Sequence, residues 1–132
     1  MRGPTRWRDG FVHVDELAPL RADRGLFSAN VYLATPPSGG HLELWPVGFR
    51  SRWAFYANAP TLSALTVQDP DAQRRLRHRL PAPLPVAVHP GDLVLLCVQR
   101  PHAVAGFDAG VRVSLQSFLT HDGHARPLVL EN

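Results

Sequence analysis

Alternation of hydrophobic and polar residues predicts several β-strands distributed along the chain. In residues 28–35, Val31 and Leu33 share one face of an extended segment, and Asn30 and Tyr32 share the other. The same alternation recurs at 11–14, 41–45 and 111–119, and residues 85–88 add a further strand signal. Residues 93–99 are apolar up to Gln99, which predicts a strand buried on both faces.

One helix is predicted in the middle of the chain. Asp69 can cap its N-terminus, Pro70 suits its first position, Leu76 and Leu80 are spaced to share a face, and Pro81 ends it. Its arginines predict either a solvated face or a docking surface for an acidic partner; they are Arg74, Arg75, Arg77 and Arg79. Many short strands with Gly and Pro turns and a single helix favour an all-β sandwich or barrel.

Composition narrows the class of protein. The 132 residues suffice for one domain, and 45% hydrophobic and 19% charged residues indicate a globular chain. We expect no membrane span, because no apolar run approaches the roughly 18–20 residues required, and no signal peptide, so a cytoplasmic location is expected. The net charge of +3 comes without any lysine, and no nucleic-acid-binding motif accompanies it, so we expect no nucleic-acid partner.

Two His-x-acid pairs are candidates for a metal site. His13 and Asp15 form the first pair, and His41 and Glu43 form the second. Residues i and i+2 of a strand point to the same side, so either pair can join His102 around one ion. Two histidines and one carboxylate on one face of a metal form the facial triad of non-haem Fe(II) oxygenases, which leaves positions for a chelating cosubstrate and O2. These residues alone leave both ligand sets open.

Six motifs in order make the chain resemble the 2-oxoglutarate and Fe(II)-dependent dioxygenases, in their prolyl-hydroxylase-like branch. That family has a His-x-Asp pair, a strand ending near Tyr-Leu, a Gly-Gly turn into a strand, a Pro-x-Gly-Asp turn into an apolar strand, a distal histidine and a basic residue about ten positions later. The chain has "HVD" (13–15), "NVYL" (30–33), "GGHLEL" (39–44), "HPGDLVLL" (89–96), "PHAV" (101–104) and "GVRVSL" (110–115). The match covers nearly the whole chain.

The resemblance implies a site. By motif order, His13, Asp15 and His102 are the catalytic Fe(II) ligands, whereas His41 and Glu43 lie on a strand that carries no ligand in the family. Arg112 matches the basic residue that binds the distal carboxylate of 2-oxoglutarate. Three further residues are candidates for contact with this cosubstrate: Ser114, Tyr32 and Asn30.

The resemblance also implies fold and activity. We expect one domain over 1–132, a distorted double-stranded β-helix of jelly-roll type, with a helix-bearing insertion at about 46–86 that covers the barrel as a lid. The expected reaction is hydroxylation of a small-molecule or amino-acid-like substrate with O2. The alternatives are a catalytically degenerate relative and a cupin-like metal- or small-molecule-binding module. The short segment before His13 is compatible with a minimal core, a truncated product or a homodimer in which a second copy completes the domain.

Overall fold

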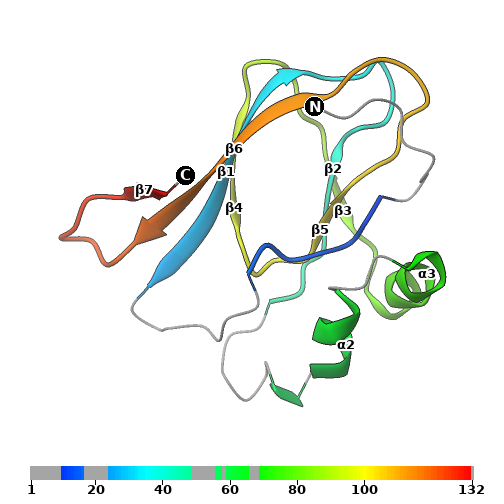
Figure 1. The fold of residues 1–132 in the computed structure, drawn as a ribbon, viewed down its shortest axis with the longest axis horizontal. Coiled ribbons are helices and arrows are strands. Elements are labelled where there is room, and N and C mark those ends of the chain that lie inside the picture. Colours follow the sequence, from blue (N-terminus) through cyan, green and yellow to red (C-terminus); the bar gives the residue numbers. More distant parts are fainter. Residues whose placement is uncertain (1–9, 17–23, 49–55, 58, 66–68, 132) are drawn as a thin grey trace.

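The computed structural model describes residues 10–16, 24–48, 56–57, 59–65 and 69–131, and their fold consists of two antiparallel β-sheets and two short helices. The larger sheet has the strand order β4-β1-β6-β7 and the smaller has the order β3-β2-β5. In Figure 1 the two sheets lie on opposite sides of the molecule, and the helices lie beside the smaller sheet. The strands are β1 (Gly25–Ala34), β2 (Leu42–Leu44), β3 (Leu84–Val86), β4 (Leu93–Cys97), β5 (His102–Val104), β6 (Val113–His121) and β7 (Val129–Glu131). The mainly-β class is as predicted.

Along β1 and β4, the larger sheet has a buried face and an exposed apolar face. Strand β1 pairs with β4 and β6, and its polar face is the buried one, with Ser28 and Tyr32 almost fully covered. The opposite face presents leucines that are more than half exposed: Leu33, Leu93, Leu95 and Leu115. The prediction that residues 93–99 are buried on both faces is therefore wrong for β4, because no element of the described chain covers its outer face.

The smaller sheet has β2 at its centre. Leu44 of β2 pairs with His102 of β5, and Glu43 pairs with Ala103. Paired residues of antiparallel strands point to the same face, and neighbours along a strand point to opposite faces. Glu43 and His102 therefore lie on opposite faces of this sheet.

The helices pack against the outer face of the smaller sheet. Helix α3 (Pro70–Arg79) begins as predicted: the Asp69 side chain accepts a hydrogen bond from the Ala72 backbone N–H at 2.7 Å, and Pro70 lies in the first turn. A second helix, α2 (Ala59–Ala64), was not predicted. A buried cluster joins both helical regions to the sheet; it comprises Val12, Trp45, Leu65, Leu76 and Ala103.

Packing of α3 bears on the predicted lid. Leu76 is 2% exposed within the cluster, and Leu80 packs against it, so this part of the 46–86 segment rests on the sheet. In the same segment Tyr56 is exposed, and the aromatic residues Trp53 and Phe55 lie outside the described residues. Within the described chain, no helix is long and apolar enough to cross a membrane.

Gly10 begins the segment that leads to His13, and its conformation excludes a side chain. Its φ of +43° lies in the left-handed region, and an added Cβ would overlap the backbone carbonyl of Val104 in β5. We expect Gly10→Ala to reduce the free energy of unfolding by at least about 1–2 kcal/mol, the cost of a left-handed L-residue before the overlap is counted. Urea unfolding measures this, with Gly91→Ala as the control: Gly91 also has a positive φ, but its added Cβ meets no atom within 4 Å. An equal loss in both variants would mean that the overlap with Val104 is relieved without cost.

Candidate metal centre

The segment of residues 11–15 lies beside β5. His13 and His102 form an antiparallel bridge in which each backbone N–H donates to the other residue's carbonyl at 2.9 Å. The side chains of His13 and His102 consequently emerge on the same face. Asp15 follows His13 by two residues, and its backbone N–H donates to the carbonyl of Val98 at 2.8 Å. Val12 and Val14, at the alternate positions, pack with the buried cluster beneath α3 instead.

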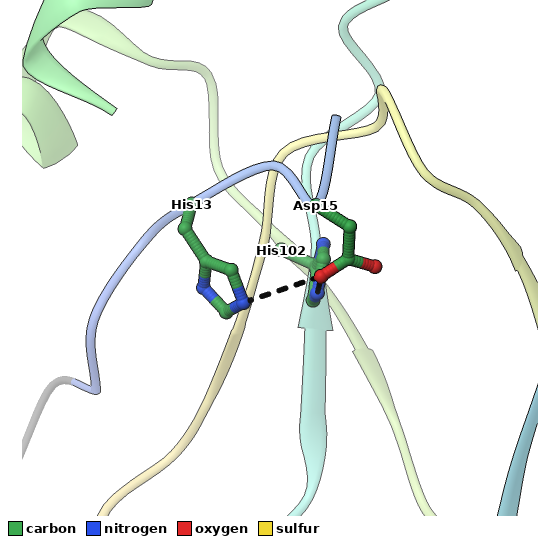
Figure 2. A group of neighbouring side chains, drawn as sticks. All are labelled: His13, Asp15 and His102. Carbon is green, nitrogen blue, oxygen red and sulfur yellow. Dashed lines mark ion pairs between the residues drawn. The ribbon is translucent and has the colours of Figure 1, made fainter. Parts of the chain in front are cut away.

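This arrangement brings together the three residues predicted as ligands (Figure 2). The Nε2 atoms of His13 and His102 each lie 3.7 Å from Oδ1 of Asp15. One potential ligand atom from each residue lies within 4.8 Å of the others, and no further group of three or more His, Cys, Asp or Glu side chains meets this condition in the described parts of the chain. The two imidazole rings are tilted by 49°, with centroids 4.3 Å apart.

Backbone carbonyls orient both imidazoles. Nδ1 of His13 lies 3.0 Å from the carbonyl oxygen of Phe11, and Nδ1 of His102 lies 2.9 Å from that of Arg100. A neutral imidazole that donates from Nδ1 has its lone pair on Nε2. With Nδ1 donating to these carbonyls, the neutral form of each histidine directs its Nε2 lone pair toward Asp15. The ring of Phe11 stacks on that of His13 at 5.2 Å.

Burial favours the neutral form of one of these imidazoles. His102 is 6% exposed, and its burial lowers its pKa below the ordinary value of 6.5. The neighbouring His13 lowers this pKa further, whereas the Arg100 carbonyl and the Asp15 carboxylate oppose the shift. A metal ligand must be deprotonated, so a lowered pKa makes His102 available as a ligand at neutral pH.

The group fits a divalent cation. Atoms 3.7 Å apart can both lie about 2.0–2.2 Å from one ion, the usual distance for nitrogen and carboxylate ligands. The second carboxylate oxygen of Asp15, Oδ2, is buried and has no hydrogen-bond partner among the described residues. A buried carboxylate oxygen without a partner is costly, and a bound cation would offset this cost.

The competing ligand set is not brought together. Glu43 lies on the face of the smaller sheet opposite His102, and its Oε2 accepts a hydrogen bond from Nη2 of Arg77 at 2.8 Å. Arg77 therefore departs from the solvated arginine face predicted for α3. Besides its pair with Glu43, its guanidinium lies 5.1 Å from the centre of the Trp45 ring. Arg74, Arg75 and Arg79 are exposed as predicted.

The residues predicted to bind the cosubstrate share one face of the larger sheet. Ser114 pairs with Tyr32, and Arg112 lies two residues before Ser114, on the same face. The Arg112 guanidinium lies 5.0 Å from the centre of the Tyr32 ring. Nε of Arg112 is buried without a hydrogen-bond partner in the described structure. Asn30 lies on the same face, and its side-chain amide donates to Oγ of Ser28 at 3.0 Å. Arg112 is thus a largely covered cation that forms no ion pair with any described carboxylate.

Comparison with known proteins adds a likeness of fold. No family model matches the chain, and no curated protein sequence matches it. Its structure is similar to a crystal structure of an N-substituted L-amino acid dioxygenase from Burkholderia ambifaria AMMD, with a TM-score of 0.58 and 16% identity over 94% of this chain. A crystal structure of such a dioxygenase from the same organism in complex with α-ketoglutarate (2-oxoglutarate) has a TM-score of 0.52 and 17% identity over 81% of this chain.

The fold of this chain is similar to that of these two dioxygenases. It spans 49% of the first of these neighbours and 39% of the second, so it corresponds to half or less of their length. At this level of identity the likeness concerns the fold, and the activity of this chain has to be argued from its own side chains.

Proposed function

We propose that the chain is an Fe(II)- and 2-oxoglutarate-dependent oxygenase. The observation that carries the proposal is the convergence of His13, Asp15 and His102, with both Nδ1 atoms held by backbone carbonyls and both Nε2 atoms facing one carboxylate oxygen. Two imidazoles and one carboxylate are the donor set of the facial triad. The fold shared with a dioxygenase that binds α-ketoglutarate supports the same proposal.

In this proposal the three side chains hold the metal and leave its remaining positions open. His13 and His102 bind through Nε2, and Asp15 contributes a negative charge that partly offsets that of the cation. The carbonyls of Phe11 and Arg100 maintain the tautomer and orientation of the imidazoles, as outer partners of metal-bound histidines usually do. When bound, Fe(II) with 2-oxoglutarate supplies the activation of O2 that couples oxidation of a C–H bond to release of succinate and CO2.

Arg112 is proposed to bind the distal carboxylate of 2-oxoglutarate. A guanidinium can donate two parallel hydrogen bonds to a carboxylate, and it does so most strongly where water is scarce. Arg112 has a buried Nε without a partner, and the neighbouring Ser114 hydroxyl can donate a further hydrogen bond. The ring of Tyr32 contacts this guanidinium, and Asn30 lies further along β1 on the same face.

The substrate is proposed to be a small, amino-acid-like molecule that undergoes hydroxylation. The neighbouring structures belong to N-substituted L-amino acid dioxygenases, which makes such amino acids the first class to test. They lend no support to the prolyl-hydroxylase-like branch in particular. The finer description of the two sheets as a double-stranded β-helix also remains a proposal, supported by the strand order within each antiparallel sheet.

Turnover tests this function. The purified chain, supplied with Fe(II), 2-oxoglutarate and O2, is expected to release succinate, and an N-substituted L-amino acid is expected to increase the rate more than its unsubstituted parent does. The His102→Ala variant should release none above background. If the chain binds Fe(II) and 2-oxoglutarate but never forms succinate, the cupin-like or degenerate binding module is the correct alternative.

A homodimer remains a prediction, and the leucine-rich outer face of the larger sheet is the surface that supports it. Apart from His121 at the end of β6, the three strands β4, β1 and β6 place no acidic or basic side chain on this face, so a second copy related by a two-fold axis can bring apolar side chains together. Three strands over seven residues span roughly 300 Å², which is within the size of the largest apolar patch on many single-chain proteins, and such patches are often functional. Sedimentation should find a dimer that Leu95→Glu dissociates; a monomeric parent chain would exclude it.

A further inference from the structure

The segment that carries His13 and Asp15 pairs with a strand along one edge only. Along its other edge, a side chain binds the backbone in place of a second strand. On one edge, the His13 backbone pairs with His102 of β5. Backbone polar groups of successive strand residues point to opposite edges, so those of Val12 face away from β5. Both are bound by Gln73 of α3: its Oε1 accepts from the Val12 N–H at 2.8 Å, and its Nε2 donates to the Val12 carbonyl at 3.2 Å.

Gln73 is suited to this contact because a carboxamide carries both a donor and an acceptor, as a peptide group does. It is 2% exposed, and Val12 is fully buried. Loss of either buried hydrogen bond is costly, because it leaves a polar group without a partner and away from water. The peptide groups on both sides of Val12 are therefore held in place, and one of them is the peptide that joins Val12 to His13.

A second residue of α3 acts on the same segment. Nη2 of Arg77 donates to the carbonyl of Gly10 at 3.1 Å, one helical turn after Gln73. Gly10 itself approaches Val104 of β5 too closely for a side chain. Residues 10–13 thus lie between β5 on one side and α3 on the other, with His13 at the end of the held stretch.

We propose that Gln73 is a positioning residue for the metal ligands His13 and Asp15. By binding both backbone groups of Val12, it determines where His13 and Asp15 point relative to His102. Helix α3 then serves the metal centre from the outer face of the sheet, without contacting the ion or the substrate. The inference rests on the proposed function, since it assumes that the three side chains bind a metal.

The test compares metal affinity with stability in the full chain. Gln73→Leu removes both hydrogen bonds at similar side-chain size, and Leu65→Ala removes packing from the cluster that contains Val12 but keeps both hydrogen bonds. Both variants should lower the temperature of unfolding in the absence of metal. Only Gln73→Leu should weaken Co(II) binding, by about 10- to 100-fold, the usual effect of removing outer partners of metal ligands. Calorimetric titration below the unfolding temperature measures the Co(II) affinity of both variants.

The outcomes separate the inference from the proposed function. If the parent chain fails to bind Co(II), the proposed metal centre is wrong and the inference with it. If the parent binds Co(II) but Gln73→Leu binds it equally well, or Leu65→Ala weakens it as much, the centre stands and the positioning role is wrong. Should Gln73→Leu not fold, Gln73→Glu replaces it. That variant keeps an acceptor for the Val12 N–H and loses the donor to its carbonyl, so we expect a smaller loss of Co(II) affinity; an unchanged affinity would overturn the role.

Discussion

Replacing Asp15 with alanine is expected to abolish tight binding of Fe(II) while the fold survives. Asp15 supplies the only carboxylate that faces both His13 and His102 in the described structure, at 3.7 Å from each Nε2. The variant loses a ligand and also the negative charge that offsets the cation. The effect should exceed the roughly 10- to 100-fold loss that follows removal of an outer partner. Anaerobic titration with Fe(II) measures the affinity, and circular dichroism verifies the fold.

Glu43→Ala is the matched control for this prediction. Glu43 is also the acid of a His-x-acid pair, but it lies on the opposite face of the sheet and accepts a hydrogen bond from Arg77. The control should lose some stability with that ion pair and keep nearly the parent affinity for Fe(II). If the two variants behave in the reverse way, His41 and Glu43 are the ligands, and the register of the smaller sheet described here is wrong.

Replacing Arg112 with leucine is expected to weaken 2-oxoglutarate binding and to leave Fe(II) affinity nearly unchanged. A charge-assisted hydrogen-bonded pair in a shielded site contributes about 1.5–3 kcal/mol. The dissociation constant of 2-oxoglutarate should therefore rise by about 10- to 150-fold, since about 1.4 kcal/mol corresponds to a factor of ten. Titration of the anaerobic Fe(II)-loaded chain with 2-oxoglutarate measures this change.

Two variants sharpen the interpretation of the Arg112 result. Arg112→Lys keeps the charge and loses the planar pair of donors, so its affinity should lie between those of the parent and Arg112→Leu. Arg79→Leu removes a positive charge from an exposed position on α3 and should have no effect. Equal 2-oxoglutarate affinity in Arg112→Leu and the parent would remove the main argument for this cosubstrate at this position.

Much of the local structure could be predicted from the sequence, because it depends on short-range patterns. Alternation identified the segments that became β1, β2 and β6, and the Asp69–Pro70 pair identified the start of α3. The grouping of His13, Asp15 and His102 followed from motif order combined with the rule that residues i and i+2 of a strand share a face. Residue spacing alone left His41 and Glu43 as alternatives.

Features that depend on contacts between distant residues could not be predicted in this way. The apolar run of β4 indicated burial on both faces, yet burial of the outer face depends on whether another element covers it, and none in the described chain does. Arg77 belonged to an arginine-rich helix, and only the fold places it over Trp45 and beside Glu43.

Gln73 gave a weak signal that was overlooked. It precedes Leu76 by three residues, so it is a polar residue on the apolar face of α3, where a buried hydrogen-bond partner is expected. That partner is the backbone of Val12, which lies 61 residues away along the chain, so only the fold identifies it.

The central claim is that His13, Asp15 and His102 hold Fe(II) and that 2-oxoglutarate binds to the same ion. Its most direct test is the visible absorption of the anaerobic chain as Fe(II) and then 2-oxoglutarate are added. We predict a metal-to-ligand charge-transfer band that requires both additions, is absent in Asp15→Ala and needs more 2-oxoglutarate in Arg112→Leu. Absence of the band in the parent chain at saturating Fe(II) and 2-oxoglutarate, or an undiminished band in Asp15→Ala, would contradict the claim.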